Sequence, residues 1–126
     1  MKKMITVFRN LENRVTKFEK GWNTHSVQEV LKQLATNPIL CNQHVRICNE
    51  NGWKEYVEDR WQHIPDEILT ITARRYRASS KTCVVCHCTI NISCFEENGM
   101  NVDMSSIGML ILEKEKGEWK IGTLFF

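Results

Sequence analysis

The run Cys83-Val-Val-Cys86-His87-Cys88 contains the residues of this sequence most able to carry chemistry. It holds a CxxC and a CxxCH pattern, which occur in zinc sites, thiol redox centres and covalent haem attachment. All three functions need side chains that converge, but residues i and i+3 of a β-strand point to opposite faces. No second CxxC or HxxxH pattern supplies further ligands. We therefore expect Cys86 and Cys88 to be small apolar core residues, with no metal and no cofactor, and keep metal or redox function as the alternative.

Titratable side chains elsewhere could act as an acid and a base. His44 stands two residues after Asn42, so the two share one face of an expected strand. Asp66 and Tyr76 are candidates to work with His44. Arg74 shares a strand face with Tyr76, and inside a cavity this pair would select an acidic or polar ligand. The competing interpretation is structural, because a lone histidine is more often a surface residue and Arg74 and Tyr76 would then lie on a solvated face.

Length and composition are typical of one globular domain. The chain has 126 residues, 42% of them hydrophobic and 25% charged. Its net charge is +2 with acids and bases interleaved, which gives no reason to expect a nucleic acid or membrane partner. The apolar run at residues 4–8 is too short for a signal peptide, and no stretch approaches the ~20 apolar residues of a membrane span. We expect a cytoplasmic protein whose six cysteines are reduced.

Three helices are predicted in the N-terminal half. Residues 4–22 carry apolar side chains at every third or fourth position, the stripe of an amphipathic helix. The capping box at residues 26–29 starts a second helix, which Asn37-Pro38 ends. A strand is expected over residues 39–48. The third helix carries the buried stripe Trp53, Val57 and Trp61 and ends at Ile64-Pro65.

The second half is predicted to be strands. They cover residues 67–78 and 82–94 and a closing hairpin at 107–126 that turns near Gly117. Residues 82–94 alternate between an apolar and a mostly polar face. In the last strand, Trp119 and Phe125 are expected on one face, and Leu124 and Phe126 on the opposite, outer face. The element order predicts an α+β fold, with helices covering one face of a strongly curved antiparallel sheet.

Three local features occur in a recognisable order: Gly-Trp-Asn-Thr-His-Ser-Val at residues 21–27, Gly52-Trp-Lys-Glu-Tyr, and Lys116-Gly-Glu-Trp-Lys-Ile121. With the element order, they resemble the nuclear transport factor 2-like superfamily, which includes ketosteroid isomerases and SnoaL-like polyketide cyclases. The resemblance implies one such domain over residues 1–126, a cystatin-like cone in which the sheet wraps around the first helix and leaves a pocket at its open end. It also implies a homodimer through the outer sheet face, where Leu124 and Phe126 would need cover.

Ketosteroid isomerases keep an oxyanion-donating tyrosine, a base aspartate and a second, protonated acid inside the cone. The resemblance places Phe18, Asn42 and Met109 at these three positions. Phenylalanine has no donor, asparagine does not titrate, and methionine neither donates nor accepts strongly. Ketosteroid-type isomerisation is therefore disfavoured. A nearly uncharged cone interior is predicted instead, which would favour an apolar ligand.

The leading hypothesis is a homodimeric protein that binds a small apolar molecule in the cone and has no evident catalytic dyad. The first alternative is a SnoaL-like cyclase, isomerase or dehydratase using His44 with Asp66 or Tyr76. The second is a protein-association module whose sheet face is the functional surface. Fold does not decide among these, so enzymatic activity stays open. The residues expected to line the pocket are Phe18, Trp22, Asn42, Trp53, Trp61, Met109 and Trp119.

Overall fold

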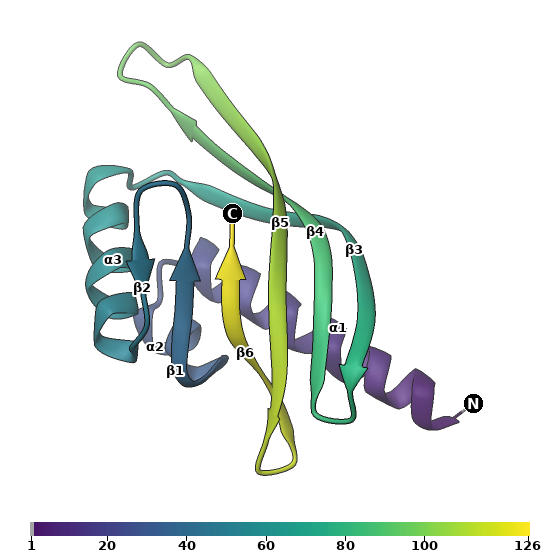
Figure 1. The fold of residues 1–126 in the computed structure, drawn as a ribbon. Coiled ribbons are helices and arrows are strands. Elements are labelled where there is room, and N and C mark those ends of the chain that lie inside the picture. Colours follow the sequence, from purple (N-terminus) through teal and green to yellow (C-terminus); the bar gives the residue numbers. More distant parts are fainter. Residues whose placement is uncertain (1) are drawn as a thin grey trace.

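The structure is a computed structural model that describes residues 2–126. Figure 1 shows helices gathered on one face of a curved sheet, so the predicted α+β fold class is confirmed. The sheet has the strand order β2-β1-β6-β5-β4-β3. Within residues 2–126, no helix has the length and apolarity needed to cross a membrane. The elements are α1 (Lys2–Asn23), α2 (Val27–Lys32), β1 (Leu34–Cys41), β2 (Arg46–Ile47), α3 (Glu50–His63), β3 (Ile68–Ser80), β4 (Cys83–Phe95), β5 (Asn101–Glu115) and β6 (Glu118–Phe125).

One strand pair departs from the expected antiparallel sheet. β1 and β6 run parallel, with Ile39 opposite Thr123 and Cys41 opposite Phe125, whereas every other neighbouring pair is antiparallel. Between the two strands the chain passes through β2, α3 and the β3–β5 meander, which is long enough for a parallel return. The sheet is therefore mixed.

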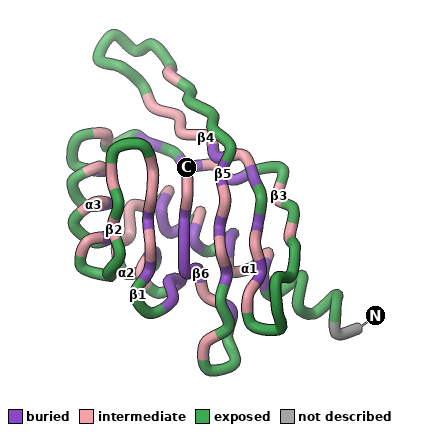
Figure 2. Tube along the Cα trace, in the orientation of Figure 1, coloured by how far each residue is buried: buried purple, intermediate pink, exposed green. Residues whose placement is uncertain are grey.

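Helix α1 lies across the inner face of the sheet. Its predicted apolar stripe is confirmed from Leu11 to Trp22, since Leu11, Val15, Phe18 and Trp22 are all buried. The first two residues of the stripe, Ile5 and Phe8, are exposed. The first turns of α1 extend past the sheet (Figure 1), and residues 4–10 are exposed. Figure 2 shows that burial is concentrated in α1 and the central strands, whereas the tip of the β4–β5 hairpin is exposed.

The second helix starts where the capping box predicts but ends early. Ser26 is its N-cap and accepts a hydrogen bond from the Glu29 N–H at 3.2 Å. The helix ends at Lys32, and not at residue 37 as predicted, because the following residues join the sheet. The Ile121 N–H donates to the Gln33 carbonyl at 2.8 Å, and Leu34 pairs with Ile121.

The strand predicted over residues 39–48 is interrupted by a turn. The Asn42 side chain accepts hydrogen bonds from the backbone N–H groups of His44 (2.8 Å) and Val45 (2.9 Å). An asparagine side chain that bonds two residues ahead mimics a backbone turn, and here it separates β1 from β2. Asn42 is therefore a turn residue at the end of the sheet.

Strand β4 keeps its predicted faces over its first half. Val84, Cys86, Cys88 and Ile90 are buried against the helices, and Cys83 lies on the other face. Cys83 and Cys86 therefore point to opposite faces, as strand geometry requires. All six cysteines are free thiols.

The prediction that Leu124 and Phe126 lie on the outer face is wrong. The register between β5 and β6 shifts between Ile111 and Leu112, so the β6 partner changes from Thr123 to Ile121 and Gly122 is left over. One extra residue in a strand moves everything beyond it to the opposite face. Leu124 is consequently fully buried in the core, and Phe126 packs against that core.

Candidate functional site

A cavity of about 420 Å³ opens at the mouth of the cone. Ile90 and Ile92 of β4, together with Phe126 at the end of the chain, form apolar walls. The β1–β2 turn contributes Asn42, and α3 contributes Arg60. A cavity of this size is within the range of small-molecule sites, which combine apolar walls with a few polar groups.

Arg60 is the charged group of this cavity, and two hydrogen bonds hold it. Its Nε donates to Glu67 Oε1 at 2.5 Å, and its Nη1 donates to the Tyr56 hydroxyl at 3.0 Å. The Tyr56 hydroxyl also lies 3.5 Å from Asn42 Nδ2. Nη2 makes no hydrogen bond with any residue of the described chain, 2–126. Arg60 therefore has one donor group left for a ligand.

Local structure brings Arg60 and Glu67 together. Tyr56 and Arg60 are one turn apart on α3, so their side chains are neighbours. The helix ends when the Ile64 N–H donates to the Arg60 carbonyl at 2.8 Å, and the Glu67 N–H then donates to the Ile64 carbonyl at 3.2 Å. This tight return places the Glu67 side chain, which is fully buried, back against Arg60.

Three buried polar atoms near this ion pair lack partners among the described residues: Glu67 Oε2, Trp22 Nε1 and Trp61 Nε1. The two indole rings meet edge to face with centroids 6.0 Å apart. His25 stacks on Trp61 at 4.9 Å, and its Nε2 lies 3.3 Å from the Glu67 carbonyl. Buried polar atoms are normally paired, so this cluster has unused capacity to hydrogen-bond a small polar group or water.

Burial governs the protonation of Glu67. Removal from water disfavours the carboxylate and raises the pKa of Glu67 above its ordinary value, while the charge and hydrogen bond of Arg60 oppose the rise. The Trp22 indole also favours the charged form, although its N–H does not reach hydrogen-bond geometry with the carboxylate. Perturbed carboxyl groups of this kind are candidate proton donors or acceptors.

Of the residues expected to line the pocket, Asn42 lines the cavity at the mouth. Phe18, Trp22 and Trp53 are fully buried and fill the cone below it, and Trp61 and Trp119 are buried as well. Met109 is half-buried on the outer face, opposite Phe125. The cavity is therefore shallower than a cone lined by these aromatics would be.

The acid–base candidates do not meet. His44 is exposed at the rim of the cavity. Asp66 accepts a hydrogen bond from the Phe95 N–H at 2.8 Å and lines a different depression. Tyr76 donates to Glu12 on α1. The combination of His44 with Asp66 or Tyr76 is therefore corrected, because the three side chains occupy separate sites.

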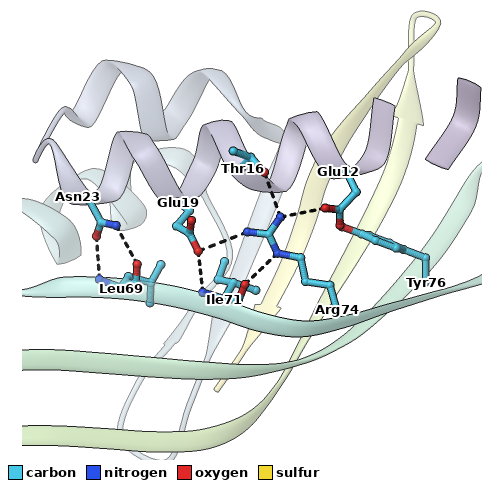
Figure 3. A network of polar contacts seen from close by, with 8 residues as sticks. All are labelled: Glu12, Thr16, Glu19, Asn23, Leu69, Ile71, Arg74 and Tyr76. Atoms are coloured by element: carbon cyan, nitrogen blue, oxygen red, sulfur yellow. Dashed lines mark hydrogen bonds and ion pairs between the residues drawn. The ribbon is translucent and has the colours of Figure 1, made fainter. Parts of the chain in front are cut away.

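Arg74 and Tyr76 do share a face, but it is turned toward α1 (Figure 3). Arg74 Nη1 donates to Thr16 at 3.0 Å, and Nη2 lies 3.3 Å from Glu19 Oε2. Burial and the hydrogen bond with Glu12 raise the pKa of Tyr76. These groups join α1 to β3, so neither is presented to the cavity at the mouth.

The prediction of a nearly uncharged cone interior is wrong, because Arg60 and Glu67 lie there. The sequence indicates this ion pair only weakly, because Arg60 and Glu67 are simply two opposite charges on either side of the helix end at Ile64-Pro65. Exposed ion pairs can have the same separation in sequence, so the burial of Glu67 follows only from the packed structure. The expectation of an interior without ionised groups rested on Phe18, Asn42 and Met109, none of which carries a charge.

No family model and no curated protein matches this sequence. Solved structures do share its fold. Hexachlorocyclohexane dehydrochlorinase LinA-type3 from Novosphingobium barchaimii LL02 superposes with a TM-score of 0.86 at 13% identity, covering 97% of this chain and 86% of that one. A Caulobacter vibrioides protein with a cystatin-like fold gives 0.79 at 9% identity, covering 94% and 86%. A putative calcium/calmodulin dependent protein kinase II association domain from Xanthomonas campestris gives 0.77 at 16%, covering 93% and 84%. At such identities the likeness establishes the cystatin-like fold alone.

Proposed function

We propose that the protein is a nuclear transport factor 2-like ligand-binding protein whose cone mouth holds a small, mainly apolar molecule with one acceptor oxygen. The observation that carries the proposal is Arg60. Glu67 and Tyr56 hold its guanidinium in place, and its free Nη2 belongs to a residue that lines a cavity with apolar walls. The apolar walls favour binding by removing hydrocarbon from water, and the arginine orients the oxygen.

The ligand chemistry follows from the ion pair. Glu67 already neutralises Arg60, so the site has no net charge to hold a bare anion. A carbonyl or ether-like oxygen accepts a hydrogen bond from Nη2 without bringing a second charge into the cavity. A hydrogen bond to a charged group contributes roughly 1.5–3 kcal/mol, which is enough to select an oxygenated ligand over a hydrocarbon of equal size.

Titration with Nile red, a neutral apolar dye with a carbonyl oxygen, tests this proposal. Ile92→Trp fills the cavity and should weaken binding at least about tenfold, since it removes the apolar space. Ile68→Trp, at an exposed position of β3, is the matched control and should bind like the wild type. Equal affinity for the wild type and Ile92→Trp would contradict the proposal.

A second candidate function is acid–base catalysis, which the free Oε2 of Glu67 favours. The raised pKa of this carboxyl would suit proton abstraction next to a carbonyl, a step shared by the cyclase, isomerase and dehydratase alternatives. The test is exchange of α-hydrogens of a bound ketone for deuterium, followed by NMR. Exchange that Glu67→Gln abolishes while dye binding persists would establish the enzyme.

Association through the outer sheet face is part of the proposal. Its central strands carry half-buried apolar side chains: Met109 lies opposite Phe125, and Ile111 lies opposite Val85. Half-exposed apolar side chains on neighbouring strands suit contact with a second copy of the chain. The cavity at the mouth weighs against the hypothesis of a pure association module, for which a filled cone would suffice.

A further inference from the structure

A second cleft lies between α1 and α2 and shares no lining residue with the cavity at the cone mouth. Its volume is about 360 Å³. Four cationic side chains line it: Arg14, Lys17 and Lys20 from α1, and Lys32 from α2. Glu29 is the one acidic residue of the lining. The net positive charge of the lining is therefore larger than the net charge of the whole chain, which is +2, so cationic side chains are concentrated in this cleft.

The lysines of this cleft are not neutralised within the chain. In residues 2–126, no carboxylate forms an ion pair with Lys17, Lys20 or Lys32. Arg14, Lys17 and Lys20 are three residues apart on one helix, and like charges at this spacing repel one another. Glu118 lies 4.0 Å from Arg14 Nη2 and offsets part of this repulsion, and an anion in the cleft would relieve the rest.

The cleft is also held in shape. Gln33 is buried at its floor, where Oε1 accepts from Arg14 Nη1 at 2.5 Å and Nε2 donates to the Glu29 carbonyl at 3.1 Å. Gly21 lets the two helices approach closely, because a Cβ there would lie 3.1 Å from Glu29 Cβ and from Val30 N. The cations therefore stand on two elements whose separation is set by packing.

We infer that this cleft binds a compact small-molecule anion carrying several negative charges, the chemistry of a polyphosphate group. Lysine ammonium groups act as point charges and suit a multiply charged ligand without a fixed plane. The cleft is large enough for a small molecule and too small to enclose part of a protein partner. Glu29 opposes the ligand and limits its affinity. This site is separate from the proposed function, and either can fail alone.

Isothermal titration calorimetry with inorganic tripolyphosphate at low ionic strength tests the inference. The double variant Lys17→Gln/Lys20→Gln should bind about tenfold more weakly, as expected for two lost, partly solvated charge contacts. Lys54→Gln/Lys81→Gln removes the same charge from exposed positions outside the cleft and should bind like the wild type. Glu29→Gln should bind more tightly, since it removes the opposing charge.

A parallel titration with citrate shows whether the cleft recognises phosphate in particular or any compact polyanion. Binding of both anions supports shared polyanion recognition, and binding of tripolyphosphate alone supports phosphate recognition. Absence of wild-type binding at millimolar tripolyphosphate, or an equal loss in both double variants, would overturn the inference. Nile red binding should be unchanged in Lys17→Gln/Lys20→Gln, which keeps the result separate from the cone mouth.

Discussion

Asn23 at the end of α1 binds both backbone groups of Leu69 in β3. Its Nδ2 donates to the Leu69 carbonyl at 2.8 Å, and its Oδ1 accepts from the Leu69 N–H at 2.7 Å (Figure 3). One turn earlier, Glu19 accepts from the Ile71 N–H at 2.7 Å. Because β3 is an edge strand, its outward backbone groups would otherwise be unpaired. Side chains of α1 therefore serve as the missing neighbour of this strand.

Replacing Asn23 should show how much this contact contributes. Asn23→Ala leaves the N–H and carbonyl of a buried residue, Leu69, without partners, and should lower the free energy of unfolding by about 2 kcal/mol. Urea denaturation measures the change. Asn13→Ala, at an exposed position of the same helix, is the control and should be nearly neutral. A loss at Asn23 no greater than at Asn13 would show that water replaces the side chain.

Glu67 should make stability depend on pH. Its pKa is raised in the folded protein, so between the ordinary value of 4.5 and the folded value the native state binds more protons than the unfolded state. The contribution of Glu67 is fully present below pH 4.5 and is lost as pH rises through the folded pKa. The stability of the wild type relative to Glu67→Gln should therefore fall as pH rises over this window. Denaturation of both proteins across the window measures it, with exposed Glu58→Gln as the control, and a difference independent of pH would contradict the prediction.

Neighbouring residues of β6 should respond differently to the same substitution. Leu124→Lys places a charge in the core and should lower the free energy of unfolding by more than about 3 kcal/mol. Phe125→Lys changes the outer face, so the protein should fold and the proposed dimer should dissociate. Circular dichroism and light scattering separate the two effects. A folded Leu124→Lys monomer would mean that Leu124, and not Phe125, faces the partner.

The rate at which each cysteine reacts with a disulfide reagent should depend on how far its side chain is buried. Cys48 is exposed and should react first, whereas Cys86 and Cys88 are buried and should react after unfolding. A hydrogen bond with Cys88 and burial also raise the pKa of Cys86, so little reactive thiolate forms there. The thiol count should be below six in the folded protein and reach six after denaturation, and Cys48→Ser should remove the fast phase. A fast reaction at Cys86 in the folded protein would contradict this order.

Patterns local in sequence predicted the elements well. The apolar stripe from Leu11 to Trp22, the cap at Ser26 and the alternation from Val84 to Ile90 are all confirmed. Each depends on the periodicity of one helix or strand, or on a side chain bonding its own backbone three residues away. Neighbouring elements do not change such signals, so the sequence alone was sufficient for them.

The tertiary structure decided which face and which partner each element received. The extra residue at Gly122 turns the side chain of Leu124 toward the core. The residues after Lys32 pair with β6, and α2 therefore ends at Lys32. The return after Ile64 brought Glu67 against Arg60 and buried it. A bulge, a strand pairing and a buried ion pair each depend on residues far apart in the chain, and their energies appear only when both partners are in place. The sequence by itself thus determined the α+β elements and their apolar faces, while packing determined the cavity, its charge and the outer surface.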